Sequence, residues 1–176
     1  MIATDLDGTL LDYSPEGSIP RFNSDILPGL LRSGAREIAV ATNQGGVCFG
    51  VLGYTRRDGR SYPTPGQFFR RLDCAGVMLA RAGIAIADVR VSCWHKAAET
   101  QPEIAAAVQA AARQLRAGLH GRHFPMWRVY TTATARKPQP LMLRSVGASE
   151  YWGDSDEDEQ AANAAGIPFV RVARFY

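Results

Sequence analysis

The sequence predicts an α/β protein in which a mostly parallel central sheet is covered by helices on both faces. Two observations predict this fold. Short apolar runs alternate with amphipathic helical stretches along the chain, and polar or acidic clusters follow several of the apolar runs. Strands that alternate with helices are typical of parallel sheets. Ligands of such sheets bind at the carboxyl ends of the strands, so the clusters mark the expected site.

The strands are predicted from short apolar runs, of which Ile38 to Ala41 is the clearest. We expect strands at 1–4, 37–42, 87–92, 127–131, 150–152 and 168–172. We expect helices at 24–33, 67–82, 100–117, 138–146 and 157–165, with a loop over 13–21. These elements together predict a Rossmann-like three-layer sandwich.

Apolar spacing and end signals support the individual helices. The helix over 67–82 has Phe68, Leu72, Ala75, Met78 and Leu79 on one face, and Gly83 follows it. Glycines at 34 and 166 end the helices over 24–33 and 157–165 in the same way.

The Ala-rich helix over 100–117 has its own start and stop signals. Thr100 and Glu103 have the spacing of a capping box, and Gly118 is expected to end the helix. Its apolar stripe consists of Ile104, Val108, Ala111 and Leu115. We interpret it as a packing helix.

Length and composition limit the classes of protein that the chain can belong to. With 176 residues and 46% hydrophobic residues, it suits a single domain, 1–176, with a hairpin insert near 51–64 and a helical insert near 96–126. It has no apolar run of membrane-spanning length and no secretory signal at its start. Three widely spaced cysteines suit a reducing compartment, so we expect a cytoplasmic protein without a membrane partner.

The first cluster, Asp5-Leu6-Asp7-Gly8-Thr9-Leu10, follows the first strand. Two carboxylates at positions i and i+2 can face one cleft, and Gly8 allows a sharp turn of the backbone. A solvated loop is the alternative, because Asp and Gly are common in turns.

Two further clusters suit a phosphate group. Thr42-Asn43-Gln44-Gly45-Gly46 ends the second strand and offers neutral donors, although a polar turn would explain it equally well. Lys137, at a helix start, would place a positive charge beside an anion. It is notable because 18 of the 20 basic residues are Arg and Lys96 is the only other Lys.

The fourth cluster holds five acidic residues within the six positions 154–159. Helix capping explains some of them, because acidic groups are favoured at a helix N-terminus. Five carboxylates repel one another unless a cation offsets them, and Mg²⁺ with its preference for oxygen ligands is the natural candidate.

These motifs, in this order, resemble the haloacid dehalogenase-like (HAD) phosphohydrolase superfamily. The resemblance rests on Asp5-x-Asp7-Gly-Thr, Thr42-Asn43, Lys137 and Gly153-Asp154-x-x-x-Asp158. Thr42 to Val47 and Arg136 to Met142 further resemble the branch that contains histidinol phosphatase, heptose bisphosphate phosphatase and the 3′-phosphatase of polynucleotide kinase.

The resemblance implies a Mg²⁺-dependent phosphomonoesterase that works through an aspartyl-phosphate. Asp5 would be the nucleophile and Asp7 the proton donor and acceptor. The implied roles of the other residues are Mg²⁺ binding by Asp5, the Asp7 carbonyl and Asp154, phosphate binding by Thr42, Asn43 and Lys137, and support from Gly8, Thr9 and Asp158.

One departure concerns zinc. Cys93-Trp94-His95 resembles the start of the zinc loop found in sugar-phosphate members of the branch, but no Cys pair precedes Arg136. We therefore interpret Cys93 as a small buried residue. The short interval between Asp7 and Thr42 also leaves no room for a large cap domain there.

Two segments are candidates for contacts with the substrate. Asp58-Gly59 predicts a tight hairpin that presents Arg56, Arg57 and Arg60 between Tyr54 and Tyr62. This pattern suits single-stranded nucleic acid, another polyanionic metabolite, or a hairpin with no binding role. The second segment contains His120, Arg122 and His123.

The substrate class stays open at this point. It is either a small phosphorylated metabolite or a nucleic acid 3′-phosphate, and a non-catalytic phosphate-binding or partner-binding domain is the alternative of another class. The chain can also be one domain of a larger assembly. The net charge of +3 conceals an asymmetry, since setting aside Asp5, Asp7 and the acids of 154–159 leaves 20 basic against 10 acidic residues. A basic surround favours a polyanionic substrate.

Overall fold

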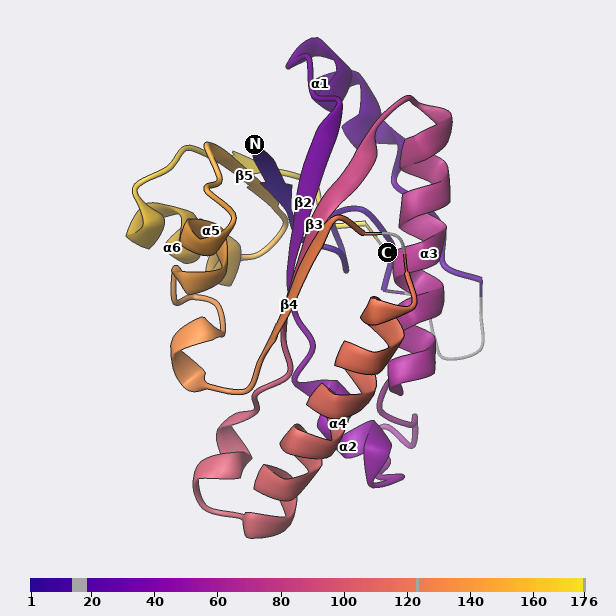
Figure 1. Cartoon of the computed structure of the whole chain (residues 1–176), viewed down its shortest axis with the longest axis vertical. Coiled ribbons are helices and arrows are strands. Elements are labelled where there is room, and N and C mark those ends of the chain that lie inside the picture. Colours follow the sequence, from indigo (N-terminus) through magenta and orange to yellow (C-terminus); the bar gives the residue numbers. More distant parts are fainter. Residues whose placement is uncertain (14–18, 123, 176) are drawn as a thin grey trace.

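The computed structural model describes residues 1–13, 19–122 and 124–175. A sheet of six parallel strands lies at its centre (Figure 1). The strands are β1 (Ile2–Thr4), β2 (Glu37–Asn43), β3 (Ala85–Ser92), β4 (Met126–Tyr130), β5 (Glu150–Gly153) and β6 (Phe169–Arg171). They are arranged in the order β4-β3-β2-β1-β5-β6. With helices on both faces, this sheet confirms the predicted Rossmann-like α/β fold.

Helices cover the two faces of the sheet and form two apolar cores. They are α1 (Leu27–Arg32), α3 (Pro65–Arg81), α4 (Pro102–His120), α5 (Leu141–Ser145) and α6 (Asp156–Ala165). Leu30, Leu72 and Leu115 bring α1, α3 and α4 into the larger core. Met142 and Ala161 bring α5 and α6 into the smaller one, on the opposite face (Figure 1).

Several short helices lie outside the predicted elements. They are α2 (Gly46–Val51) and two 3₁₀ turns at Lys96–Glu99 and Ala133–Ala135, whereas a third 3₁₀ turn, Ser24–Ile26, forms the first part of the helix predicted at 24–33. The α2 helix and the start of α4 lie beyond the carboxyl ends of the strands (Figure 1). Among the described residues there is no large cap domain, and none of their helices has the length and apolar character needed to cross a bilayer.

The starts of α3 and α4 both differ from the predicted starts at 67 and 100. Thr64 and Gln67 form a complete capping box at the start of α3. The capping box predicted at Thr100 is wrong: α4 begins at Pro102, its N-cap is Gln101, and no side chain caps it. Thr100 instead ends the preceding 3₁₀ turn.

The other end of α4 also differs from the prediction. Gly118 lies inside the helix, which continues to His120. A Cβ atom at position 118 would overlap the ring of Phe69 in α3. This glycine therefore serves close helix packing and does not end the helix.

The direction in which strands are added to the sheet reverses between β1 and β5, so this position is the topological switch point of the sheet. From β1 the chain proceeds outward through β2, β3 and β4, and then returns to β5 on the other side of β1. In the register of the sheet, Thr4 pairs with Val40 of β2 and Trp152 of β5. Asp5 and Asp154 therefore leave neighbouring strands at the point where parallel sheets bind ligands.

Candidate active site

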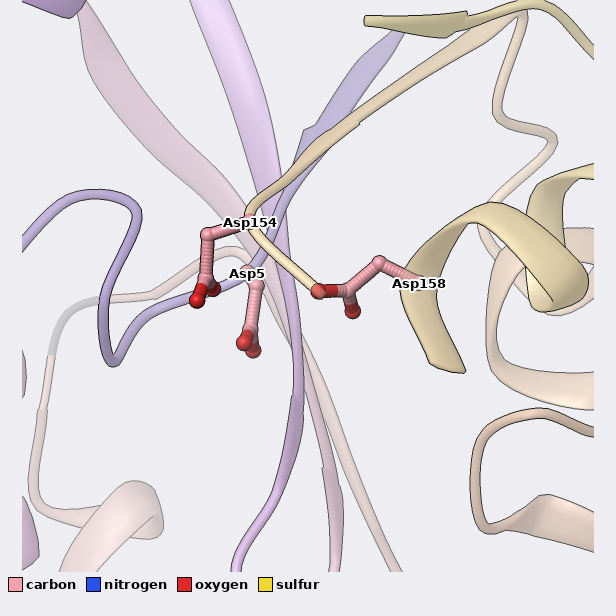
Figure 2. Close-up of side chains that lie close together, drawn as sticks. All are labelled: Asp5, Asp154 and Asp158. Carbon is pink, nitrogen blue, oxygen red and sulfur yellow. The ribbon is translucent and has the colours of Figure 1, made fainter. Parts of the chain in front are cut away.

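Three aspartates from distant parts of the sequence converge beyond the ends of β1 and β5 (Figure 2). Asp5 follows β1, Asp154 follows β5, and Asp158 lies in the first turn of α6. The backbone N–H of Asp5 donates to the carbonyl of Trp152 at 2.9 Å, which holds the two strand ends together. One carboxylate oxygen from each aspartate lies within 4.8 Å of those of the other two.

Lys137 supplies the positive charge at the centre of this cluster. Its Nζ lies 2.5 Å from Oδ1 of Asp158 and 3.0 Å from Oδ1 of Asp5. All three residues are buried, and Lys137 is 3% exposed. A buried ammonium must be paired, so Lys137 depends on the two carboxylates as much as they depend on it.

Asp158 is held by hydrogen bonds on both of its oxygens. Oδ2 accepts from the hydroxyl of Ser155 at 2.6 Å and from its backbone N–H at 3.1 Å. The Tyr151 hydroxyl lies 2.9 Å from Oδ1 and accepts from Nζ of Lys137 at 2.8 Å. Because its oxygens are already used, Asp158 acts as the anchor of Lys137 rather than as a free ligand.

Asp154 is enclosed by the turn that follows β1 and by the residues after β6. Thr9 donates its hydroxyl to Oδ1 at 3.2 Å, and Nε of Arg174 donates to Oδ2 at 2.6 Å. Gly8 has a φ of +83°, and a Cβ there would lie 2.7 Å from Oδ2 of Asp154. Only glycine suits both this conformation and this close approach.

Asp5 is the least satisfied of the three carboxylates. Burial raises its pKa to about 7, against the opposing effect of Lys137 and together with the negative charges of Asp158 and Asp7. Its buried Oδ1 lies 3.0 Å from Nζ of Lys137 but has no hydrogen-bond partner of good geometry among the described residues. A buried carboxylate that shares the Lys137 ammonium with Asp158 and lies close to the carboxylate of Asp154 suits a hard divalent cation such as Mg²⁺. The donor set of Asp5 and Asp154 therefore fits the expected metal.

The carboxylate of Asp7 contacts two residues outside the aspartate cluster, Gln44 and Arg71. Its Oδ2 accepts from Nε2 of Gln44 at 2.8 Å, and its Oδ1 lies 2.7 Å from the guanidinium of Arg71. Gln44 also donates to Oγ1 of Thr42 at 3.1 Å. Asp7 thus faces the turn after β2, with its side chain 24% exposed at the open side of the site.

The turn after β2 is joined to the segment that carries Lys137. Asn43 donates from its side-chain amide to the carbonyl of Lys137 at 3.2 Å and accepts the Lys137 backbone N–H at 3.0 Å. Thr42 is 1% exposed and lies beside Gln44. The structure therefore brings the four sequence clusters together at one edge of the sheet.

The predicted hairpin is present as a small turn after α2. The N–H of Arg56 donates to the carbonyl of Arg60 at 2.6 Å, Gly59 has a φ of +80°, and Thr55 bridges Ser61. Asp58 pairs with Arg60 at 3.3 Å and with Arg56 at 3.9 Å. Arg56, Arg57 and Arg60 are all exposed. The rings of Tyr54 and Tyr62 pack against Phe49 of α2, which holds the turn beyond the carboxyl ends of the strands (Figure 1).

The second predicted contact segment lies elsewhere. His120 is the last residue of α4 and Arg122 follows it before the start of β4, which places both at the opposite edge of the sheet from the carboxylates. Arg122 forms a two-pronged pair with Asp73 at 2.7 and 2.8 Å, and its guanidinium lies 4.2 Å from the centre of the Phe69 ring. His123 lies outside the described residues. The structure therefore does not bring His120 and Arg122 to the site.

Three residues that line the site, Arg71, Tyr151 and Arg174, were not singled out from the sequence, and Gln44 was named only as part of the Thr42–Gly46 cluster. Arg71 had a detectable signal, because it stands within the apolar stripe of α3, three positions after Phe68 and four before Ala75. Tyr151 and Arg174 stand in or beside strands with no such local signal.

No known family model, curated protein or solved structure matches the chain. Support for a function therefore comes from the geometry of the site and from the motif resemblance.

Proposed function

We propose that the protein is a Mg²⁺-dependent phosphomonoesterase that uses Asp5 as its nucleophile. The observation that carries the proposal is the position of Asp5 at the switch point of the sheet, beside Lys137 and Asp154. The order of the four motifs, which resembles the HAD superfamily, supports the same function.

In the proposed first step, an oxygen of Asp5 attacks the phosphorus atom of the substrate. A P–O bond forms to Asp5, and the P–O bond to the leaving group breaks. The leaving oxygen takes a proton from Asp7. The product of this step is an aspartyl-phosphate and a free alcohol.

In the second step, water attacks the phosphorus atom of the aspartyl-phosphate and Asp7 accepts the proton. The Asp5 carboxylate is released together with inorganic phosphate. Dividing the reaction in this way replaces one difficult displacement by two easier ones.

The remaining residues supply charge and orientation. Lys137 would offset negative charge on both Asp5 and the phosphate, while Thr42 and the backbone of Asn43 would bind phosphoryl oxygens. Asp5 and Asp154 would hold Mg²⁺, which, when bound, screens the repulsion between carboxylate and phosphate.

The test is hydrolysis of a generic aryl phosphate with and without Mg²⁺. Turnover should require Mg²⁺ and fall at least about 1,000-fold in Asp5→Asn, because a carboxamide is not a competent nucleophile. Asp25→Asn, at an exposed position outside the site, is the matched control and should keep full activity. The proposal fails if the wild-type protein turns over no phosphomonoester from a panel of sugar phosphates, nucleotides and 3′-phosphorylated oligonucleotides. Full activity of Asp5→Asn would also refute it.

A nucleic acid 3′-phosphate is the second candidate substrate. The exposed arginines of the 56–60 turn favour it, because they lie at the same edge of the sheet as the carboxylates. Phosphate contacts of this kind suit a polynucleotide backbone.

A further inference from the structure

Residues 172–175, which follow β6, cross the edge of the sheet next to the aspartate cluster. The N–H of Val172 donates to the carbonyl of Gly153 at 2.8 Å, and the N–H of Phe175 donates to the carbonyl of Gly8 at 3.0 Å. The segment thus runs from the end of β5 to the turn that follows β1. We call residues 172–175 the strap.

The strap places the guanidinium of Arg174 against Asp154, the candidate metal ligand. Nε of Arg174 lies 2.6 Å from Oδ2 of Asp154. The Arg174 guanidinium also lies 5.7 Å from the centre of the Tyr13 ring, and that of Arg21 lies 5.3 Å from the ring of Phe175. Two aromatic contacts therefore reinforce the two backbone hydrogen bonds of the strap.

With Arg174 in this position, the carboxylate of Asp154 is closed to solvent. Its side chain is 0% exposed, whereas that of Arg174 is 42% exposed. Thr9 occupies the other oxygen, Oδ1. A hydrated cation can reach Asp154 only if one of these groups moves, and Arg174 is the partly exposed one.

Simultaneous binding of Arg174 and a divalent cation to the carboxylate of Asp154 is unfavourable, because both groups are positively charged. A guanidinium at 2.6 Å from Oδ2 and a dication on the same carboxylate would be neighbouring like charges in a poorly solvated site. A cavity of about 500 Å³ lies beside the strap and is lined in part by Asn23, Trp152 and Arg174. It offers Arg174 a place to turn when it leaves Asp154.

We propose that the strap is a metal-sensitive latch: Arg174 and the divalent cation compete for Asp154, so that metal binding releases the strap and a closed strap lowers metal affinity. The inference rests on the Mg²⁺ site of the proposed function but not on its chemistry. Because the coupling is reciprocal, a closed strap weakens metal binding by the same factor by which bound metal disfavours closure, so removing Arg174 should strengthen metal binding.

The test is calorimetric titration of Mg²⁺ into metal-free protein, without substrate. Arg174→Gln should bind Mg²⁺ about three- to tenfold more tightly than wild type. In wild type the metal must first displace the partly exposed, charge-assisted contact between Arg174 and Asp154, whereas the variant has no such contact to break. Arg171→Gln is the matched control. It removes the same charge from a side chain that contacts the backbone carbonyl of Asp154 and not its carboxylate. Its affinity should stay within about twofold of wild type.

Amide hydrogen exchange gives the second readout. Saturating Mg²⁺ should accelerate exchange of the Phe175 amide in wild type, because release of Arg174 frees the strap from Gly8. In Arg174→Gln the same amide should exchange fast without metal.

Three results would overturn the latch. The first is an affinity of Arg174→Gln for Mg²⁺ that is equal to or weaker than that of Arg171→Gln. The second is no Mg²⁺ binding by wild type and Arg174→Gln alike. The third is unchanged or slower exchange of the Phe175 amide on addition of Mg²⁺. Neither readout involves turnover, so a protein that binds Mg²⁺ in this way without hydrolysing phosphate would refute the proposed function alone.

Discussion

The Nζ of Lys137 lies 2.5 Å from Oδ1 of Asp158, and both side chains are buried at the switch point of the sheet. The same Nζ faces Asp5 at 3.0 Å, so a single ammonium balances two carboxylates. The charge of the proposed nucleophile and the stability of the fold therefore depend on the same lysine.

Lys137→Met should destabilise the metal-free protein by about 3–5 kcal/mol, because it leaves two buried carboxylates without their cation. Urea denaturation measures the change in the free energy of unfolding. Lys96→Met is the matched control, since this other lysine is exposed and its loss should change stability by less than about 0.5 kcal/mol. Equal stability of the two variants would show that the buried lysine does not neutralise the cluster.

The stability of the metal-free protein should depend on the protonation of Asp5. The fold raises the pKa of Asp5 from 3.8 to about 7, so the folded state binds this proton more tightly than the unfolded chain. The resulting stability is fully present below pH 3.8 and is lost as the pH rises to about 7. It amounts to at most about 4 kcal/mol.

The amide of Asp5→Asn does not titrate, so this variant does not lose stability in the same way as the pH rises. Without metal, the melting temperature of Asp5→Asn minus that of wild type should therefore increase between pH 4 and pH 7.5. Adding Mg²⁺ at pH 7.5 should stabilise wild type and reduce the difference. A difference in melting temperature that is constant with pH would contradict the raised pKa.

Gly118→Ala should destabilise the protein by about 1–3 kcal/mol, because the added methyl group overlaps the Phe69 ring at the contact of α3 and α4. Gly76→Ala is the control, for which we expect an effect on stability of the opposite sign. It also lies inside a helix, but its Cβ would lie 3.8 Å from Cδ1 of Ile86, an ordinary contact. There the gain in helix propensity should stabilise by up to about 1 kcal/mol. Chemical denaturation measures the change in the free energy of unfolding. Changes of opposite sign in the two variants would support the close packing at Gly118, and changes of the same sign would contradict it.

Arg122→Ala should lower stability by about 1–2 kcal/mol, because it removes a two-pronged ion pair and a cation–π contact. Turnover of an aryl phosphate by the folded protein should be unchanged, because Arg122 lies at the far edge of the sheet. Arg122→Lys should recover only part of the stability, since an ammonium cannot pair with both oxygens of Asp73 in the same way. A loss of turnover without a loss of stability would restore Arg122 as a substrate contact.

Arg56→Ala combined with Arg57→Ala tests the nucleic acid substrate. If the turn contacts a polynucleotide, kcat/KM for a 3′-phosphorylated oligonucleotide should fall about tenfold or more at low salt, and its salt dependence should become shallower. Turnover of the aryl phosphate should stay unchanged. Arg113→Ala combined with Arg128→Ala removes the same charge from exposed positions on α4 and β4 and serves as the control. Equal effects of the two double variants on the oligonucleotide would exclude a specific role of the turn.

Most of the layers and the positions of the four clusters could be predicted from the sequence alone. The period of apolar residues is a local property, so the stripe of α3 and the buried run of β2 could be recognised without a structure. Asp5 and Asp154 could be placed at one edge because the carboxyl ends of parallel strands coincide. End signals were less reliable: the glycine at 166 has the expected left-handed φ, but the one at 118 packs inside a helix.

Which side chains meet at the site depends on how the helices and strands pack, and this could not be predicted from the sequence. Arg71 reaches Asp7 across 64 positions and Arg174 reaches Asp154 across 20, and the spacing of residues along a chain carries no information on such encounters. The same holds for Arg122, which was predicted to contact the substrate as part of an insert, whereas the direction of α4 places it at the opposite edge. Local periodicity predicts which elements form, whereas the directions in which helices and strands pack decide which of their side chains share a site.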